Sequence, residues 1–177
     1  FAAMKVEVTL VEGRARLLPF LDLEMGERLR GAMQHLGIDF RLEAQTKSVV
    51  RRGEEIVVEL ASGEQLVCDR LLFAAGRTGR TAELDLGKVG LAADKRGYIT
   101  VDESYRTTVP SIYAAGDVIG FPALASTSMD QARIAVCHAF GLSYKKPLSH
   151  LLPYGVYTIP EVSCVGYSEE QVVDKNI

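Results

Sequence analysis

The chain has 177 residues and a formal net charge of −3, and 47% of its residues are hydrophobic while 24% are charged. These values predict a folded globular chain of about one domain's length and exclude a disordered one. Acidic and basic residues are interspersed, so no basic stripe indicates a nucleic-acid partner, and no apolar run predicts a membrane-spanning helix or a secretory signal.

The first elements along the chain form a strand–helix–strand pattern. Residues 6–12 are an apolar, β-branched run that ends in an acid, which is typical of a buried parallel strand. A helix is predicted over 22–36, with Asp22 as its cap and Gly37 just after its end. A second strand is predicted over 38–43, and the three elements together make a parallel unit.

The next segment predicts a small antiparallel insert. Its short strands are expected at 49–50, 56–60 and 65–68. Residues 70–75 are again expected to form a buried strand, which runs into Gly76-Arg77-Thr78-Gly79.

The remaining elements alternate between loops and short regular segments. A mostly loop-like region is expected at 81–104, short strands at 98–101 and 112–115, a helix from 126 or 127 to 140, an alternating strand at 157–166, and a capping box at Ser168-Glu-Glu-Gln171. The chain begins at Phe1 and ends soon after the capping box, so we expect a fragment of a longer protein.

The cysteines and histidines show no spacing typical of a reactive or metal-binding site. They are Cys68, Cys137, Cys164, His35, His138 and His150. No CxxC-type pair indicates a zinc site or a dithiol redox centre. We interpret the cysteines as buried, reduced thiols of a cytoplasmic protein, assign no catalytic role to any histidine, and expect no metal site.

Glu12 and Arg14 follow the first predicted strand at its carboxyl end. An acid at this position of a dinucleotide-binding fold accepts hydrogen bonds from the adenosine ribose hydroxyls. Arg14 could instead meet a 2′-phosphate, so the pair leaves NAD and NADP equally open. Gly76-Arg77-Thr78-Gly79 also follows a strand end, where it is either a ligand loop or a simple βα turn.

Asp117 and Ala125 form the sharper candidate site. A short carboxylate after a strand and a glycine can accept two hydroxyls of a sugar or ribityl chain. The small residues Ala123, Ala125 and Ser126 would let a helix N-terminus press against a flat ligand, and its positive end would favour the negative charge of a reduced flavin. The alternative is an Asp-capped loop before a surface helix.

These segments resemble the two-dinucleotide-binding flavoprotein reductases, the group of dihydrolipoamide dehydrogenase, glutathione reductase and mercuric reductase. Residues 107–117 are similar to their second FAD motif, 73–77 to the end of their NAD(P) domain, and 157–161 with Val165-Gly166 to the start of their dimerisation domain. Within the group, the sequence is most similar to the soluble pyridine nucleotide transhydrogenases. That similarity lies in 17–22, in 76–79 with Thr81, and in 116–126 with Asp130-Gln131 and Arg133.

The resemblance implies an α/β fold that is part of such a reductase. It implies a Rossmann-like parallel sheet with an antiparallel insert in the second half of an NAD(P)-binding domain (1–82). The C-terminal segment of an FAD-binding domain (83–151) and the start of an α+β dimerisation domain (152–177) would follow. The parent protein would be a homodimer or a higher homo-oligomer.

The resemblance also assigns roles. Asp117 would bind the flavin ribityl chain, Ala125 would lie at the flavin by its backbone, Gly76 would give the nicotinamide nucleotide room, and Glu12 and possibly Arg14 would meet its adenosine end. The implied activity is hydride transfer between NADPH and NAD through FAD, with ping-pong kinetics at one nucleotide site and no catalytic side chain in this chain. A dihydrolipoamide dehydrogenase-like disulfide reductase and an isolated, non-catalytic binding or dimerisation fragment remain alternatives.

Overall fold

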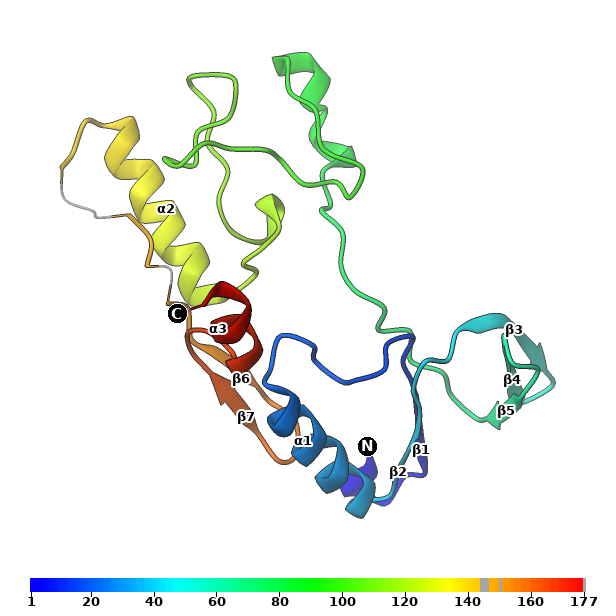
Figure 1. Cartoon of the computed structure of the whole chain (residues 1–177). Helices are drawn as coiled ribbons and strands as arrows, with labels where there is room; N and C mark the ends of the chain where they lie inside the picture. The colour runs from blue at the N-terminus through cyan, green and yellow to red at the C-terminus, as the bar shows by residue number, and fades with distance from the viewer. Residues whose placement is uncertain (144–146, 150, 177) are drawn as a thin grey trace. The chain divides into compact units, whose positions relative to one another are not determined.

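The computed structural model describes residues 1–143, 147–149 and 151–176, so His150 lies outside the described residues. The chain divides into two compact units, which are described separately below (Figure 1). The first unit comprises 1–74 and 153–177, and the second comprises 75–152. No helix among the described residues is long and apolar enough to cross a membrane.

The first unit opens with the predicted parallel pair of strands. A short 3-10 turn, η1 (Ala2–Met4), precedes β1 (Val8–Val11), and β1 pairs in parallel with β2 (Ile38–Arg41). The backbone N–H of Glu12 donates to the carbonyl of Arg41 at 2.9 Å, which extends the pairing to the end of the strand. This confirms the strand–helix–strand unit and leaves Glu12 at the carboxyl end of β1.

The connecting helix α1 spans Leu23–His35, close to its predicted bounds. Gly37 takes a φ of +92° just beyond the helix, where a residue without Cβ is favoured, and its N–H donates to Gln34 O. Asp22 occupies the N-cap position, but its carboxylate makes no capping bond to α1. The expectation that Asp22 caps this helix is therefore wrong, because that carboxylate accepts a hydrogen bond from the start of another helix.

The antiparallel insert forms as predicted. It consists of β3 (Thr46–Arg52), β4 (Glu55–Leu60) and β5 (Gln65–Cys68), in the order β3-β4-β5. Gly53 and Gly63, both with positive φ, lie in the two turns. Val57, Val58 and Leu60 of the central strand are buried.

The predicted strand over 70–75 is wrong for this chain. The segment is irregular, and Phe73 is 85% exposed. A strand that is buried on both faces needs neighbours on both edges for its backbone N–H and C=O groups. Among the described residues no strand pairs with this segment, so its apolar pattern is not realised as a strand.

The C-terminal part of the first unit packs against α1. Strands β6 (Tyr154–Val156) and β7 (Val162–Cys164) pair antiparallel, and α3 (Glu169–Lys175) follows. The expected single strand over 157–166 is thus wrong, because a turn that contains the cis Ile159–Pro160 bond interrupts it. A small core joins Leu21 and Leu29 to Val162. The capping box at Ser168 is confirmed, with both of its hydrogen bonds present.

Over its described residues, the second unit contains mostly irregular chain and one long helix. Its regular segments are the 3-10 turns η2 (Ala82–Leu84), η3 (Leu86–Val89) and η4 (Gly116–Ile119), and the helix α2 (Ala125–Ala139). The loop-like region and α2 are as predicted, but the short strands expected at 98–101 and 112–115 are only the isolated bridges Ala93–Ile99 and Arg106–Tyr113. A single bridge satisfies too few backbone groups to make a strand.

Candidate nucleotide-binding sites

Glu12 and Arg14 lie together at the end of β1 in the first unit. The carboxylate Oε1 of Glu12 accepts a hydrogen bond from the backbone N–H of Arg14 at 3.0 Å and lies 3.8 Å from the Arg14 Nε. The backbone carbonyls of Glu12 and Arg14 accept from the N–H groups of Ala44 and Glu43. The backbone is therefore held in place, while the Arg14 side chain is 65% exposed.

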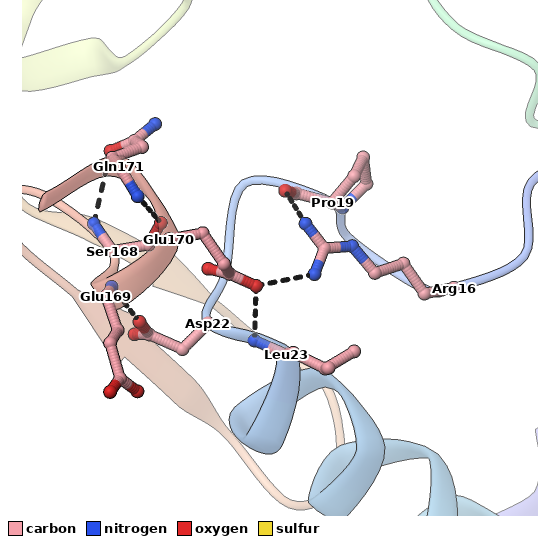
Figure 2. Close-up of polar contacts among 8 residues, drawn as sticks. All are labelled: Arg16, Pro19, Asp22, Leu23, Ser168, Glu169, Glu170 and Gln171. Carbon is pink, nitrogen blue, oxygen red and sulfur yellow. Dashed lines mark hydrogen bonds and ion pairs between the residues drawn. The ribbon is translucent and has the colours of Figure 1, made fainter. Parts of the chain in front are cut away.

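The link from this site to α1 is fixed by four residues that we call the capping cluster: Arg16, Asp22 and Glu170 through their side chains, and Glu169 through its backbone N–H (Figure 2). The Glu170 carboxylate accepts from the backbone N–H of Leu23, the first residue of α1, at 3.1 Å. In return, Asp22 Oδ1 accepts from the backbone N–H of Glu169, the first residue of α3, at 2.6 Å. Each helix start is thus satisfied by a carboxylate next to the other helix.

Arg16 completes the capping cluster. Its Nη1 donates to Glu170 Oε1 at 2.8 Å, and its Nη2 donates to the carbonyl of Pro19 at 3.0 Å (Figure 2). The hydrogen bond from Arg16 is the main cause that lowers the pKa of the Glu170 carboxyl below its ordinary value. The carboxylate is therefore ionised throughout the neutral range, as its capping role requires.

Cys164 lies beside this group but is not a reactive thiol. Burial, together with the nearby Asp22 carboxylate, raises the pKa of Cys164. A raised pKa leaves little thiolate at neutral pH, and the thiolate is the nucleophilic form. All three cysteines are free in the structure, but only Cys137 is buried, so the expectation of burial is wrong for Cys68 and Cys164, which are partly exposed.

In the second unit, Asp117 lies in the 3-10 turn η4. Its side chain is 49% exposed, and its Oδ2 lies 3.1 Å from the Arg77 Nη1. The turn ends at Gly120, whose N–H donates to the carbonyl of Asp117 and whose φ is +87°. A Cβ on Gly120 would lie 3.2 Å from the ring of Tyr98, so the turn packs closely on that residue.

Arg77 is itself held by a well-defined segment of the second unit. The Tyr98 hydroxyl donates to the Arg77 carbonyl at 3.0 Å, and the Arg96 guanidinium donates to the same carbonyl at 3.2 Å. Two glycines make this approach possible, since a Cβ on Gly79 would lie 2.1 Å from the carbonyl oxygen of Gly97. The backbone of the Gly76–Gly79 loop is therefore fixed against the 96–98 segment.

The other predicted residues of the second unit are Gly76 and Ala125, and both have a distinctive local geometry. Gly76 has a φ of +94°, and nothing lies within 4 Å of the position that a Cβ would take. Ala125 is the first residue of α2 and is exposed. The N–H groups of the first turn of a helix lack acceptors within the helix, so those at Ala125 and Ser126 can meet an external polar group.

These residues fit a dinucleotide whose hydroxyls and flat ring need separate partners. The Asp117 carboxylate is half exposed and can accept from hydroxyls, while the α2 start offers backbone donors. No cluster that could hold a metal ion occurs among the described residues. The structure groups Glu12 with Arg14 in one unit, and places Gly76, Asp117 and Ala125 in the other.

Arg77 and Gln131, which the sequence argument did not assign to the site, make polar side-chain contacts with the Asp117 turn. Arg77 forms the ion pair, and Gln131 of α2 accepts a hydrogen bond from the Gly116 N–H. The position of Arg77 after Gly76 was a usable signal, since loop cations often pair with nearby acids. Nothing in the local pattern distinguishes Gln131 from a surface residue of an amphipathic helix.

A parallel strand pair with an acid at its carboxyl end, as in the first unit, is typical of dinucleotide-binding folds. The sequence profile described as "Pyridine nucleotide-disulphide oxidoreductase" matches residues 1–135. The chain belongs to this family of flavoprotein oxidoreductases.

Individual relatives sharpen the comparison. The chain is 42% identical over 177 residues to the soluble pyridine nucleotide transhydrogenase of Colwellia psychrerythraea, and 44% identical over 177 residues to that of Mycobacterium bovis. These alignments cover 100% of the chain but 38% of each relative.

Solved structures with the same fold carry other names. LpdA from Mycobacterium tuberculosis matches with a TM-score of 0.91 and 30% identity, over 99% of this chain and 38% of that one. The HOCl-induced flavoprotein disulfide reductase RclA from Escherichia coli matches with a TM-score of 0.89 and 30% identity, over 98% of this chain and 41% of that one. The matched α/β architecture confirms the predicted fold class.

Proposed function

We propose that the protein containing this chain transfers hydride between NADPH and NAD through FAD. The observation that carries the proposal is the 42–44% identity, over the whole chain, to proteins named soluble pyridine nucleotide transhydrogenase. One nucleotide site serves both substrates in turn, so the kinetics are ping-pong. The chain spans 38% of those relatives, and the remaining residues of the site lie in the part that it does not match.

The residues of this chain bind and orient rather than react. Asp117 accepts hydrogen bonds from ribityl hydroxyls, and the start of α2 at Ala125 offers N–H groups and a positive dipole end to the electron-rich edge of the ring system. Glu12 and Arg14 contact the adenosine end of the nicotinamide nucleotide, and Gly76 leaves room for it. When bound, the flavin supplies the hydride acceptor and donor.

The resemblance also supports a division of the chain. Residues 1–82 belong to the NAD(P)-binding domain, 83–151 to the FAD-binding domain, and 152–177 to the start of a dimerisation domain. The parent protein is then a cytoplasmic homodimer or higher homo-oligomer. Size-exclusion chromatography with light scattering on the complete polypeptide tests this, and a monomer would contradict it.

A disulfide reductase of the dihydrolipoamide dehydrogenase type is the second candidate. It is favoured by the likeness to the flavoprotein disulfide reductase RclA, with its TM-score of 0.89. Such an enzyme needs a redox-active cysteine pair, and the cysteines of this chain form no pair. The sequence of the complete gene product separates the candidates, since a redox-active cysteine pair upstream of this chain would favour the reductase.

The direct test uses the complete polypeptide encoded by the gene that carries this sequence. The purified protein is treated anaerobically with NADPH and then with thio-NAD⁺. We expect the flavin absorbance to bleach with NADPH and to recover with thio-NAD⁺. The amount of reduced thio-NAD formed should equal the amount of flavin that had been reduced. If the flavin bleaches and thio-NAD⁺ stays oxidised, transhydrogenation is wrong. The 177-residue chain alone serves as the control for the third alternative, a non-catalytic fragment, and should bind no flavin.

A further inference from the structure

Gln131 is a buried polar residue on the inner face of α2. It follows Thr127 and precedes Ala135 by one turn each, and all three are buried. Gln131 is 1% exposed and is one of the two largest fully buried side chains among the described residues. An amide placed out of contact with water needs a hydrogen-bond partner, because leaving it unsatisfied is costly.

The partner is the backbone directly before Asp117. Gln131 Oε1 accepts a hydrogen bond from the Gly116 N–H at 2.7 Å, and this bond is buried. Gly116 begins the turn η4, and the first N–H of such a turn has no acceptor within the turn. Gln131 therefore satisfies a group that would otherwise be buried without a partner.

The same helix restricts Gly116 from a second side. Gly116 has a φ of +84°, and a Cβ there would lie 3.1 Å from the hydroxyl oxygen of Ser128. Ser128 and Gln131 are three residues apart, so they are neighbours on one face of α2. The Ala115–Gly116 peptide, one residue before Asp117, is thus hydrogen-bonded to Gln131, and Gly116 itself lies close to Ser128.

We propose that Gln131 is a positioning residue for the flavin site, and that it acts through Asp117 without touching the flavin. This inference rests on the proposed function. The bond to Gly116 sets the direction in which the Asp117 carboxylate leaves the backbone. A second anchor, the bond from the Ile99 N–H to the Val118 carbonyl at 3.0 Å, holds the far side of the turn. Loss of the Gln131 bond frees only the side that carries Asp117.

The experiment uses variants of the complete polypeptide, with the FAD dissociation constant measured by flavin fluorescence. Gln131→Met keeps the length of the side chain and removes the acceptor, and we expect FAD to bind about tenfold or more weakly, as for a lost buried hydrogen bond. Gln131→Glu keeps an acceptor oxygen but buries a carboxyl group, so its FAD affinity should lie between that of Gln131→Met and that of wild type. Thr127→Val, a change of equal size one turn earlier on the same face, should leave FAD affinity within about twofold of wild type.

A double-mutant cycle separates positioning from a general effect on folding. If Gln131 acts through Asp117, Gln131→Met should weaken FAD binding much less in an Asp117→Asn background than in the wild type. Equal losses in both backgrounds would overturn the proposal, as would wild-type FAD affinity in Gln131→Met. If Gln131→Met is insoluble, Gln131→Asn, which draws the oxygen back by one methylene, takes its place in the cycle. A wild-type protein that binds no FAD would overturn both the proposed function and this inference, whereas a flavin-loaded wild type with unaffected variants overturns this inference alone.

Discussion

The capping cluster of the first unit and the Asp117 turn of the second both provide an acceptor for a backbone N–H that has none within its own helix or turn. They do so with different chemical groups. In both, a side chain distant in sequence accepts a hydrogen bond from an N–H at the start of a helix or turn. The capping cluster uses the carboxylates of Asp22 and Glu170, whose side chains are partly exposed, although the Oε2 atom of Glu170 is itself buried. The turn uses the neutral amide of Gln131, which is buried.

The difference follows from where each acceptor lies. A carboxylate at a helix start gains from the helix dipole, and contact with water keeps the cost of its charge small. A carboxylate in the position of Gln131 would lose its hydration, which costs free energy for a charged group. A neutral amide accepts the same hydrogen bond without the cost of burying a charge. The carboxylates of the capping cluster can therefore change protonation state with pH. The Gln131 amide cannot, so its hydrogen bond persists at any pH that keeps the protein folded.

Among the substitutions that test these two regions, the largest loss of stability is expected at Gly79, in the loop that carries the Asp117 partner Arg77. In Gly79→Ala the new Cβ would lie 2.1 Å from the Gly97 carbonyl oxygen, a backbone atom that cannot rotate away. We expect a loss of about 3 kcal/mol or more in the free energy of unfolding, in the range of severe overpacking. Urea denaturation of the complete polypeptide measures it.

The matched control for that substitution is Gly31→Ala in α1. Nothing lies within 4 Å of the position of its Cβ, and its φ is not positive. We expect a stabilisation of about 0.5–1 kcal/mol, because alanine favours the helix interior over glycine. Equal effects of the two substitutions would mean that the close approach of Gly79 to Gly97 does not occur.

An intermediate effect is expected at Asp117. Asp117→Asn removes the charge but keeps the size, and it should weaken FAD binding about tenfold or more, as for lost hydrogen bonds to a charged group. Protein stability should change by about 1 kcal/mol or less, since the ion pair with Arg77 is largely exposed. Isothermal titration with FAD and urea denaturation check the two parts. A large loss of stability would instead assign Asp117 a structural role.

The smallest change in the free energy of unfolding is expected for Glu170→Gln, and this change should depend on pH. The folded-state pKa of this carboxyl is lowered, first by the hydrogen bond from Arg16. Its contribution to stability is therefore fully present above its ordinary pKa of about 4.3 and is lost as the pH falls through the lower folded-state value. Glu170→Gln should be less stable than wild type at pH 7, and the difference should shrink below about pH 4.

Urea denaturation at a series of pH values measures this difference. Glu24→Gln provides the control, because Glu24 pairs with Arg28 only on the exposed surface of α1. Its effect should be smaller at every pH. A difference at Glu170 that does not vary with pH would show that the carboxylate contributes through its shape rather than its charge.

Local signals in the sequence were sufficient for the elements whose stability is local. The bounds of α1 and α2, the insert strands and the capping box at Ser168 follow from periodicity, turn residues and caps. The strand expected at 70–75 failed, because a buried parallel strand exists only with partners, and partners are a property of the tertiary structure.

The candidate site was predictable to a similar degree. Asp117 and the start of α2 could be identified from a strand-end acid followed by small residues. The contact of Gln131 could not, since it joins segments distant in sequence, and the position of Arg77 after Gly76 indicated the loop but not its partner Asp117. For the same reason the Asp22 carboxylate was assigned to the wrong helix, because a capping residue does not reveal from its sequence which N–H it will meet.

The capping cluster also has a consequence for the order of folding. Leu23 and the Glu170 that caps it are 147 residues apart in sequence. At the usual synthesis rate of about 5–20 residues per second, Glu170 is synthesised roughly 7–30 s after Leu23. During this interval the Leu23 N–H lacks the acceptor that it has in the folded chain. Strands β1 and β2 both lie before residue 42, so they are available to pair during that time. The strand end that carries Glu12 and Arg14 can thus form early. The start of α1, at the other end of this segment, is capped only after α3 has been synthesised.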